Sequence, residues 1–370
     1  MTVPIARRNL MHEKGRLALS VAGIAAALAL ILLLLGFRSG IYATLTAFVD
    51  NLGADLIVAQ SGVQGMFASD SAVPRDLHDE AVAAAGAREA GHIVVADIIF
   101  TAGETKTPVL LVGYEPDTPF GAPWNLGAGR AVTADDEILL DTWLAQRADI
   151  AVGDRIEVLG RTFQVVGLTR ETTSWMSPYI FVSLEAATTA LHLNNVVSYH
   201  LLRLPAMADP DQAIATIEAT LSGVDALTPE EVAAADRRVL ATVMDTPLNV
   251  MIVIGAVIGV AVIGLTAYTA IVDGRREYGV LKAVGASGRH LTWLVLRETA
   301  YRALFGFLLG VGLAHLFAAL IMAVWPQFTI VIHPGTVVRA GALALLMTAA
   351  AAWLPVRRLH GIDPALVFKE

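Results

Sequence analysis

Few residues of this chain have a type and spacing that suit catalysis. The chain contains no cysteine, which excludes thiolate nucleophiles, disulfides and cysteine-ligated metals. No Gly-x-x-x-x-Gly-Lys-Ser/Thr loop occurs, so the sequence offers no cradle for the phosphates of ATP. No serine, histidine and aspartate stand in a recognisable nucleophile context. We therefore predict that the chain has no catalytic residue and binds no cofactor of its own.

Histidines are the remaining candidates for chemistry. His192 and His200 flank the Asn194-Asn195 turn and could face each other across a hairpin. No carboxylate stands at ligand spacing beside them, so we predict no metal site. His315 lies within a long apolar run, where a titratable group is a functional candidate, either for haem ligation or for proton handling. A neutral imidazole bonded to a neighbouring helix is the simpler interpretation.

The segment Asp273–His290 carries the strongest local pattern. Its residues Tyr278, Leu281 and Val284 recur at i, i+3 and i+6, which predicts one apolar stripe on a short helix that two glycines then end. Such a helix can dock into a groove of a soluble partner and transmit a movement of that partner to the apolar runs before and after it. A turn on the membrane surface with snorkelling arginines is the alternative.

Four long apolar runs must position this segment. Hydrophobic residues make up 55% of the 370-residue chain, above the share of about 45–50% in soluble proteins. About 20 apolar residues suffice to span a bilayer as a helix. The first run is too long for a secretory signal and no cleavage site follows at once, so we expect an uncleaved anchor. The predicted spans are 17–37, 248–272, 303–325 and 335–354.

Charge predicts the orientation of these spans. The stretch Arg38–Pro247 holds 28 acidic against 12 basic residues, a net charge of −16, whereas 6 acidic against 14 basic residues give the rest +8. Short loops rich in Lys and Arg stay in the cytoplasm, and a large domain crosses whatever its charge. We therefore expect an extracytoplasmic domain over 38–247 and an outer loop over 326–334. The segments expected in the cytoplasm are 1–16, 273–302 and 355–370.

The residue pattern of the 38–247 domain predicts a mixture of helices and strands. The net negative charge of this domain argues against a nucleic-acid partner. Strands and helices alternate irregularly, which favours an α+β domain over a doubly wound sheet. The expected fold is an α-helical membrane protein with four transmembrane helices, one plus three, and this large domain inserted after the first. Its predicted strands are 55–60, 92–100, 108–114, 155–159, 162–168, 178–183 and 198–204, and its helices are 76–85, 184–193 and 210–221.

The order of residues in 276–287 is specific. An Arg-Glu pair, a glycine, a leucine with a basic neighbour and Gly-Ala-Ser follow one another as Arg276-Glu277, Gly279, Leu281-Lys282 and Gly285-Ala286-Ser287. This order resembles the cytoplasmic motif of FtsX-like permeases, the MacB type of ABC transporter. The ending over 355–365 and the stretches 52–59, 141–148, 153–155 and 162–167 are similar to the same family.

The resemblance implies a permease that works as a dimer with two ATPase subunits, which bind the ATP and magnesium. The 273–290 segment would be the coupling helix. Permeases for haem and glycolipid export that lack a fused ATPase are the most similar in form. The residues implied to contact the ATPase or to shape the helix are Arg276, Glu277, Gly279, Leu281, Lys282, Gly285 and Ala286.

The expected function is therefore that of a permease subunit in the bacterial cytoplasmic membrane, with both termini inside. ATP hydrolysis in a partner chain would drive extrusion of an amphipathic substrate, such as haem, a lipid or glycolipid, or a hydrophobic drug. Two alternatives stay open. The same moving spans could control an extracellular hydrolase or sensor kinase without moving cargo, or the chain could be a membrane-anchored binding module without an ATPase.

Overall fold

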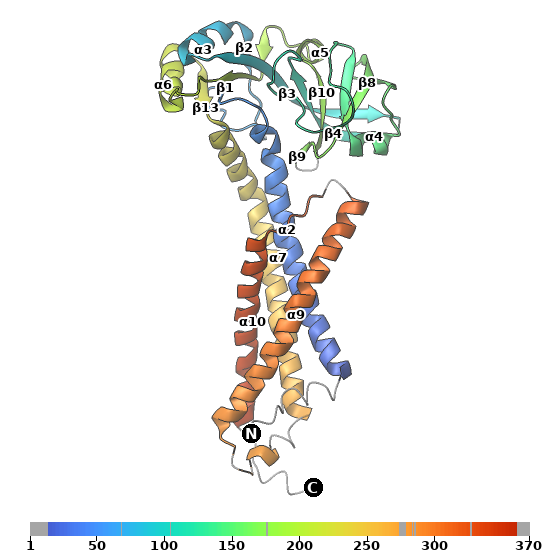
Figure 1. Cartoon of the computed structure of the whole chain (residues 1–370), viewed down its shortest axis with the longest axis vertical. Coiled ribbons are helices and arrows are strands. Elements are labelled where there is room, and N and C mark those ends of the chain that lie inside the picture. The colour runs from blue at the N-terminus through green and yellow to red at the C-terminus, as the bar shows by residue number, and fades with distance from the viewer. Residues whose placement is uncertain are drawn as a thin grey trace. The chain divides into compact units, whose positions relative to one another are not determined.

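The computed structural model of the chain contains two compact units, which we describe separately (Figure 1). The first unit comprises residues 1–39, 245–324 and 330–370, and the second comprises 40–244 and 325–329. The residues that the structure describes are 14–67, 69–103, 105–174, 177–273, 279–282, 284, 286–325 and 328–360.

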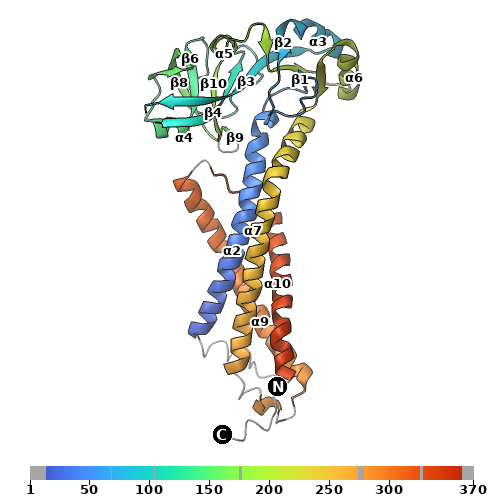
Figure 2. The same cartoon turned by 180° about the vertical axis from the view of Figure 1, so that it is seen from behind.

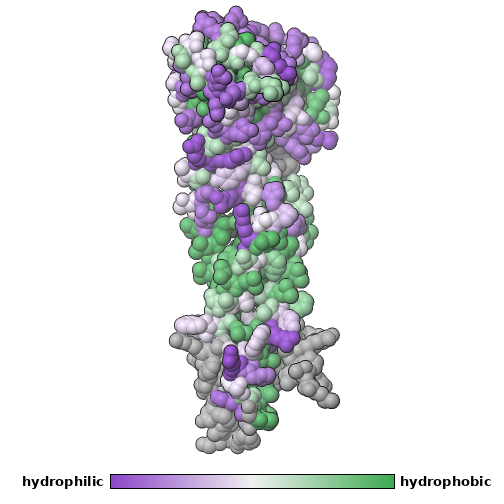
Figure 3. All heavy atoms as spheres, turned by 60° about the vertical axis from the view of Figure 1, so that its left-hand side comes forward, coloured by the Kyte–Doolittle hydropathy of each residue, from purple (hydrophilic) through white to green (hydrophobic). Residues whose placement is uncertain are grey.

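Among the residues that the structure describes, four helices are long and apolar enough to cross a membrane, which agrees with the predicted number of spans (Figures 1 and 2). These helices extend beyond the predicted apolar runs, because helical turns that contain charged residues continue them. Hydrophobic side chains gather along their surface (Figure 3). The helices are α2 (Lys14–Asp50), α7 (Pro229–Asp273), α9 (Gly288–Val324) and α10 (Pro334–His360).

Small residues let these helices pack closely. A Cβ atom on Gly306 of α9 would lie 2.5 Å from Ile24 Cγ2 of α2, and one on Gly310 would lie 2.9 Å from the Ala25 carbonyl oxygen. On α7, a Cβ on Gly255 would lie 3.3 Å from Ile31 Cγ1 of α2. Gly306, Gly310 and Gly255 thus let α9 and α7 approach α2 of the same chain closely.

An ion pair joins α2 to α7 just beyond the apolar run of the first helix. Arg38 Nη2 donates to Asp245 Oδ2 at 2.6 Å, and both side chains are partly exposed. Nearby, the carbonyl of Gly36 accepts a hydrogen bond from the Val331 amide at 3.0 Å. These contacts fix the α2 backbone against α7 and against the chain that leads into α10.

The second unit is an α+β domain built on an 11-stranded mixed sheet of order β13-β1-β12-β3-β4-β10-β6-β8-β5, with β7 paired to β8 and β9 to β10. A separate pair joins β2 to β11. The strands are β1 (Leu56–Gln60), β2 (Val73–Pro74), β3 (Glu89–Ala102), β4 (Thr105–Tyr114), β5 (Leu126–Gly129), β6 (Glu137–Asp141), β7 (Arg155–Val158), β8 (Arg161–Thr169), β9 (Thr173–Ser174), β10 (Ser177–Ser183), β11 (Val196–Val197), β12 (Tyr199–Arg203) and β13 (Val224–Leu227).

Short helices cover this sheet, and their starts follow capping rules. Asp141 accepts a hydrogen bond from the Trp143 amide, and Ser183 accepts one from the Ala186 amide. Asp209 caps α6, where Pro210 occupies the first turn. The helices are α3 (His78–Ala85), α4 (Thr142–Ala148), α5 (Leu184–Ala190) and α6 (Pro210–Thr220), and the 3₁₀ turn η1 (Arg75–Leu77) precedes α3.

The region over 113–130, which is rich in glycine and proline, contains regular structure. It contains β5, whose Leu-Gly-Ala-Gly sequence has no strand pattern of its own and is held by pairing with β8. Trp124, in the same region, packs in an aromatic group with ring centroids 6.2 Å from Phe48 and 5.8 Å from Tyr179. Trp124 is thus half-buried and packs against the core of the domain.

Glu137, at the start of β6, is a buried carboxylate that organises the loop before it. It is only 7% exposed and forms an ion pair with Arg130. It also accepts hydrogen bonds from the amides of Thr133 and Ala134 at 2.8 and 3.2 Å. The hydrogen bond from Arg130 is the main cause that lowers the pKa of Glu137 to about 2.

Glu137→Ala should destabilise the domain by about 3 kcal/mol, because several donors lose a charged acceptor. The pKa of this acid is lowered in the folded state, so its contribution is present above the ordinary pKa of about 4.5 and is lost as the pH falls towards 2. Thermal unfolding of the full chain in detergent, followed by tryptophan fluorescence between pH 7 and 3, measures both effects. The exposed Glu157→Ala serves as control, and an equal loss of stability in both variants contradicts this role.

Candidate functional site

The segment between α7 and α9 is the candidate functional site, and the structure describes part of it. Residues 279–282 form a helical turn, and the amide of Ala286 donates to the Leu281 carbonyl at 2.9 Å where the turn ends. Of the predicted coupling residues, the structure places Gly279, Leu281, Lys282 and Ala286. Arg276, Glu277 and Gly285 lie outside the described residues, so their predicted roles stay predictions.

One side of this segment packs onto the ends of two long helices. Leu281 and Ala286 lie against a small buried cluster. Ile271 of α7 and Leu291 and Val295 of α9 form that cluster, each at most 3% exposed. Displacing the segment therefore moves apolar contacts with both helices at once.

The other side of the segment is exposed. The side chain of Val284 is 83% exposed and that of Val280 is 46% exposed. Leu281 packs on the buried cluster and Val284 does not, although the Val284 amide still donates to the Val280 carbonyl at 3.0 Å. Tyr278, the third residue of the predicted stripe, lies outside the described residues.

Ser287, the last residue of the Gly-Ala-Ser sequence, stands directly before α9. Its side chain accepts a hydrogen bond from the His290 amide at 3.3 Å, and its carbonyl accepts one from the Leu291 amide. A serine in this place caps the first turn of α9. Ser287 thus helps to start α9.

An apolar groove of about 950 Å³ lies between α9 and α10. Its walls include Trp293, Phe307 and Leu345, and Arg289 and Arg297 line the same groove. The guanidinium of Arg297 lies 5.7 Å from the centre of the Tyr301 ring, over its face. The arginines precede the most apolar part of α9, so the groove has a basic end and an apolar body.

Comparisons with known proteins agree with this arrangement. The profile of the MacB-like periplasmic core domain matches residues 17–220, and that of the FtsX-like permease C-terminal region matches residues 249–364. The first match alone covers more than half of the chain. The chain belongs to the MacB-type family of FtsX-like permeases.

Two relatives match this chain over almost its whole length. An uncharacterized ABC transporter permease of Mycobacterium bovis is 24% identical over 366 residues, which cover 98% of both chains. Another from Mycobacterium tuberculosis is 22% identical over the same coverage. The protein is thus a multi-pass ABC transporter permease, a role that in general implies a partner ATPase.

Solved structures resemble part of the permease. The periplasmic region of MacB from Actinobacillus actinomycetemcomitans is 10% identical and covers 50% of this chain and 94% of its own, with a TM-score of 0.39. The extracellular domain of the transporter YknZ from Gram-positive bacteria is 12% identical and covers 48% of this chain and all of its own, with a TM-score of 0.35.

His315 of the permease does not join a neighbouring helix as expected. Its Nδ1 lies 2.9 Å from the carbonyl oxygen of Val311, one turn earlier in the same helix, and the residue is exposed on α9. A bond to its own helix satisfies one ring nitrogen locally. This contact offers no support for haem ligation or proton handling.

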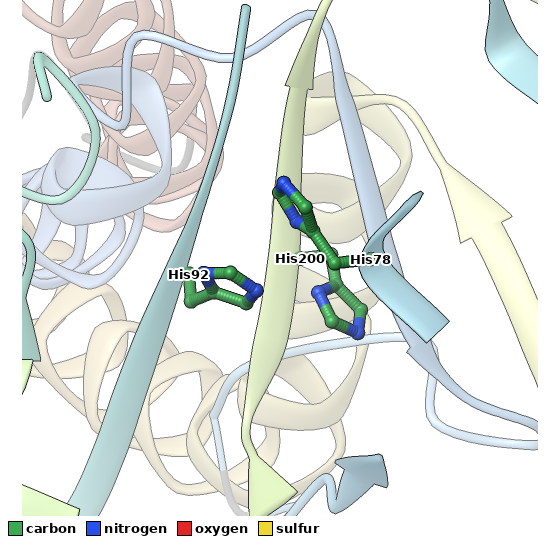
Figure 4. Close-up of side chains that lie close together, drawn as sticks. All are labelled: His78, His92 and His200. Carbon is green, nitrogen blue, oxygen red and sulfur yellow. The ribbon is translucent and has the colours of Figure 1, made fainter. Parts of the chain in front are cut away.

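A cluster of three histidines lies in the α+β domain, and sequence reasoning missed it (Figure 4). His92 of β3 and His200 of β12 stand opposite each other in the antiparallel register, and His78 is the first residue of α3. His192, which the sequence paired with His200, instead lines a polar hollow of about 430 Å³ together with Arg75. Spacing in the sequence does not indicate the cluster, because the pairing of β3 with β12 and the start of α3 bring its members together.

Burial lowers the pKa of two of these imidazoles, His78 and His200. Burial first, and then the neighbouring His92, lowers the pKa of His200 to about 4. The same two causes lower the pKa of His78. Burial alone would raise the pKa of Glu115, but its hydrogen bond with His92 and the charges nearby lower it overall. The arrangement at neutral pH is thus two uncharged rings and an ionised carboxylate beside a third ring.

Proposed function

We propose that this permease couples ATP hydrolysis by a separate ATPase to the extrusion of an amphipathic substrate. The observation that carries the proposal is the packing of Leu281 and Ala286 against the ends of α7 and α9. A partner that pushes the exposed side of the segment moves both helices, because the contact is apolar and close-packed. The coupling residues are those that the family motif implies.

The groove between α9 and α10 supports the choice of substrate class. Haem, a lipid, a glycolipid and a hydrophobic drug each combine an apolar body with a polar or charged group. An apolar wall with arginines near one end suits such a molecule, and anionic head groups in particular. Binding there from the inner leaflet places the substrate directly beside the segment that the ATPase would move.

The assembly that we propose is a homodimer of permeases with two ATPase subunits, in the bacterial cytoplasmic membrane and with both termini inside. Charge supports the orientation, since basic residues are concentrated outside the 38–247 domain. The outward face of α7 supports the dimer, because a long apolar surface is available there. Its exposed residues include Val250, Val253, Ile254, Val257 and Ile258.

The test is reconstitution of the full chain with its cognate ATPase in lipid, followed by ATP turnover with haem, lipids and drugs as additions. Strong stimulation by one amphiphile supports export. A response only to an extracellular hydrolase or a sensor kinase supports the signalling alternative and contradicts extrusion. The native mass of the complex reports whether two permeases and two ATPases are present.

Glu277→Lys should uncouple this complex without unfolding the permease. Reversing one charge on a docking face introduces like-charge contacts, and a cost of about 1.4 kcal/mol already weakens association tenfold. Co-purification with the ATPase and stimulated ATP turnover are the measurements. Glu218→Lys, the same change on the exposed face of α6, is the matched control. Unchanged association and turnover in Glu277→Lys count against the docking assignment.

A further inference from the structure

The histidine cluster has the donor set of a metal site. One imidazole nitrogen from each of His78, His92 and His200 lies within 4.8 Å of the corresponding nitrogens of the other two. The ring centres of His78 and His92 are 4.3 Å apart, and those of His92 and His200 are 5.0 Å apart. Figure 4 shows the three rings side by side. One helix and two strands thus converge on one point.

Hydrogen bonds on the outer side fix which nitrogen of two rings carries the proton. His92 Nδ1 lies 3.0 Å from Glu115 Oε1, and His200 Nε2 lies 3.1 Å from the Pro74 carbonyl oxygen. An ionised carboxylate and a carbonyl can only accept, so both of these nitrogens must donate. The lone pairs of the two rings are therefore on His92 Nε2 and His200 Nδ1.

The inner nitrogens are buried and unsatisfied. Among the residues that the structure describes, no hydrogen-bond donor reaches His78 Nδ1, His92 Nε2 or His200 Nδ1. Leaving a buried acceptor without a donor costs about 1–3 kcal/mol, and here three such atoms lie together. A cation at the centre would satisfy all three at once.

We propose that His78, His92 and His200 bind a late first-row divalent cation, with Zn²⁺ as the representative ion. Imidazole nitrogens are the ligands that zinc, copper and nickel favour. At a Zn–N distance of about 2.0–2.1 Å, tetrahedral ligands lie about 3.3 Å apart, so no pair of nitrogens has to approach by more than about 1.5 Å. His78 is the half-buried member of the cluster, whereas the residues His92 and His200 are buried.

The surroundings support a ligated metal. A carboxylate that accepts from the outer nitrogen of a histidine orients the ring and raises its basicity, and Glu115 does this for His92. Arg75 is the nearby cation, 3.9 Å from Glu115, but its short ion pair of 2.7 Å is with Glu185. The proposed metal would join α3 to β3 and β12 and so clamp the helix on the sheet.

Metal binding is tested on the full chain in detergent, purified through a tag without histidines and stripped with a chelator. Zn²⁺ is then titrated against a competing indicator, and Co²⁺ is added separately to record the visible absorption of a nitrogen-ligated site. We expect one Zn²⁺ per chain and a rise in the thermal unfolding temperature. Absence of zinc uptake by the unmodified chain overturns the proposal and leaves a water molecule as the occupant.

Three variants complete the design. Glu115→Gln should weaken zinc binding by about 10–100-fold, and His78→Gln should weaken it further. His78 is preferred to the fully buried His200 because its ring is half-exposed and its loss should leave the metal-free unfolding temperature unchanged. His192→Gln, an exposed histidine of the same domain, is the matched control and should bind as the unmodified chain does. Equal zinc affinity in His78→Gln and in this control refutes the assignment.

Discussion

Leu281→Asp is expected to reduce substrate-stimulated ATP turnover of the reconstituted complex by about tenfold or more while the ATPase stays bound. Leu281 packs on the buried cluster of Ile271, Leu291 and Val295. A carboxylate cannot remain in such an apolar site without a large desolvation cost, so the segment should detach from both helix ends. The loss of a few kcal/mol of contact suffices for the effect on turnover.

Val284→Asp is the matched variant, because the same change falls on a side chain that is 83% exposed in the same segment. It should weaken association with the ATPase and leave the turnover of each assembled complex unchanged. Co-purification and turnover are therefore measured together for both variants. If Leu281→Asp and Val284→Asp behave alike, the two sides of the segment do not have the separate tasks that we assign to them.

Gly310→Leu is expected to have the largest effect on the stability of the helical unit. A Cβ atom at this position would lie 2.9 Å from the Ala25 carbonyl oxygen and 3.2 Å from Leu28 Cβ. Backbone cannot move aside as a flexible side chain can, so α9 must separate from α2. Overpacking of this kind costs about 1–3 kcal/mol, and a full leucine side chain lies at the upper end.

Gly312→Leu is the control within the same helix, since no described atom lies within 4 Å of a Cβ built there. Both variants gain the helix propensity of leucine over glycine, up to about 1 kcal/mol, so the difference between them isolates the contact with α2. Thermal unfolding in detergent measures that difference. Similar unfolding temperatures for Gly310→Leu and Gly312→Leu contradict the close packing of α9 on α2.

Much of the fold could be predicted from the sequence, because hydrophobic run length and strand alternation are local signals. The four spans and the predicted strands of the domain correspond to helices and strands of the structure. β5 could not be predicted, since its residues owe their extended form to β8. β6 was missed because acidic residues flank a run of only a few apolar ones.

The site was only partly predictable for related reasons. The order of residues in 276–287 indicated the segment, but spacing at i and i+3 does not tell which of its residues pack on other helices. Here Leu281 packs on the buried cluster, whereas Val284 is 83% exposed. The histidine cluster depends on strand register and on where α3 begins, and neither is a local property of the sequence.

The first and last strands of the domain determine how it can respond to movement. β1 follows α2 and β13 precedes α7, and the two strands are hydrogen-bonded neighbours, with Ile57 opposite Leu227. Phe48 of α2 and Val232 of α7 both lie in the core of the domain. A movement shared by α2 and α7 would carry the domain as a rigid body. A movement that separates the two helices would instead break the hydrogen bonds between β1 and β13 one at a time, starting at Ile57. The domain is therefore suited to a movement that α2 and α7 share, and the β1–β13 pair is the part that a separation of the two helices would break first.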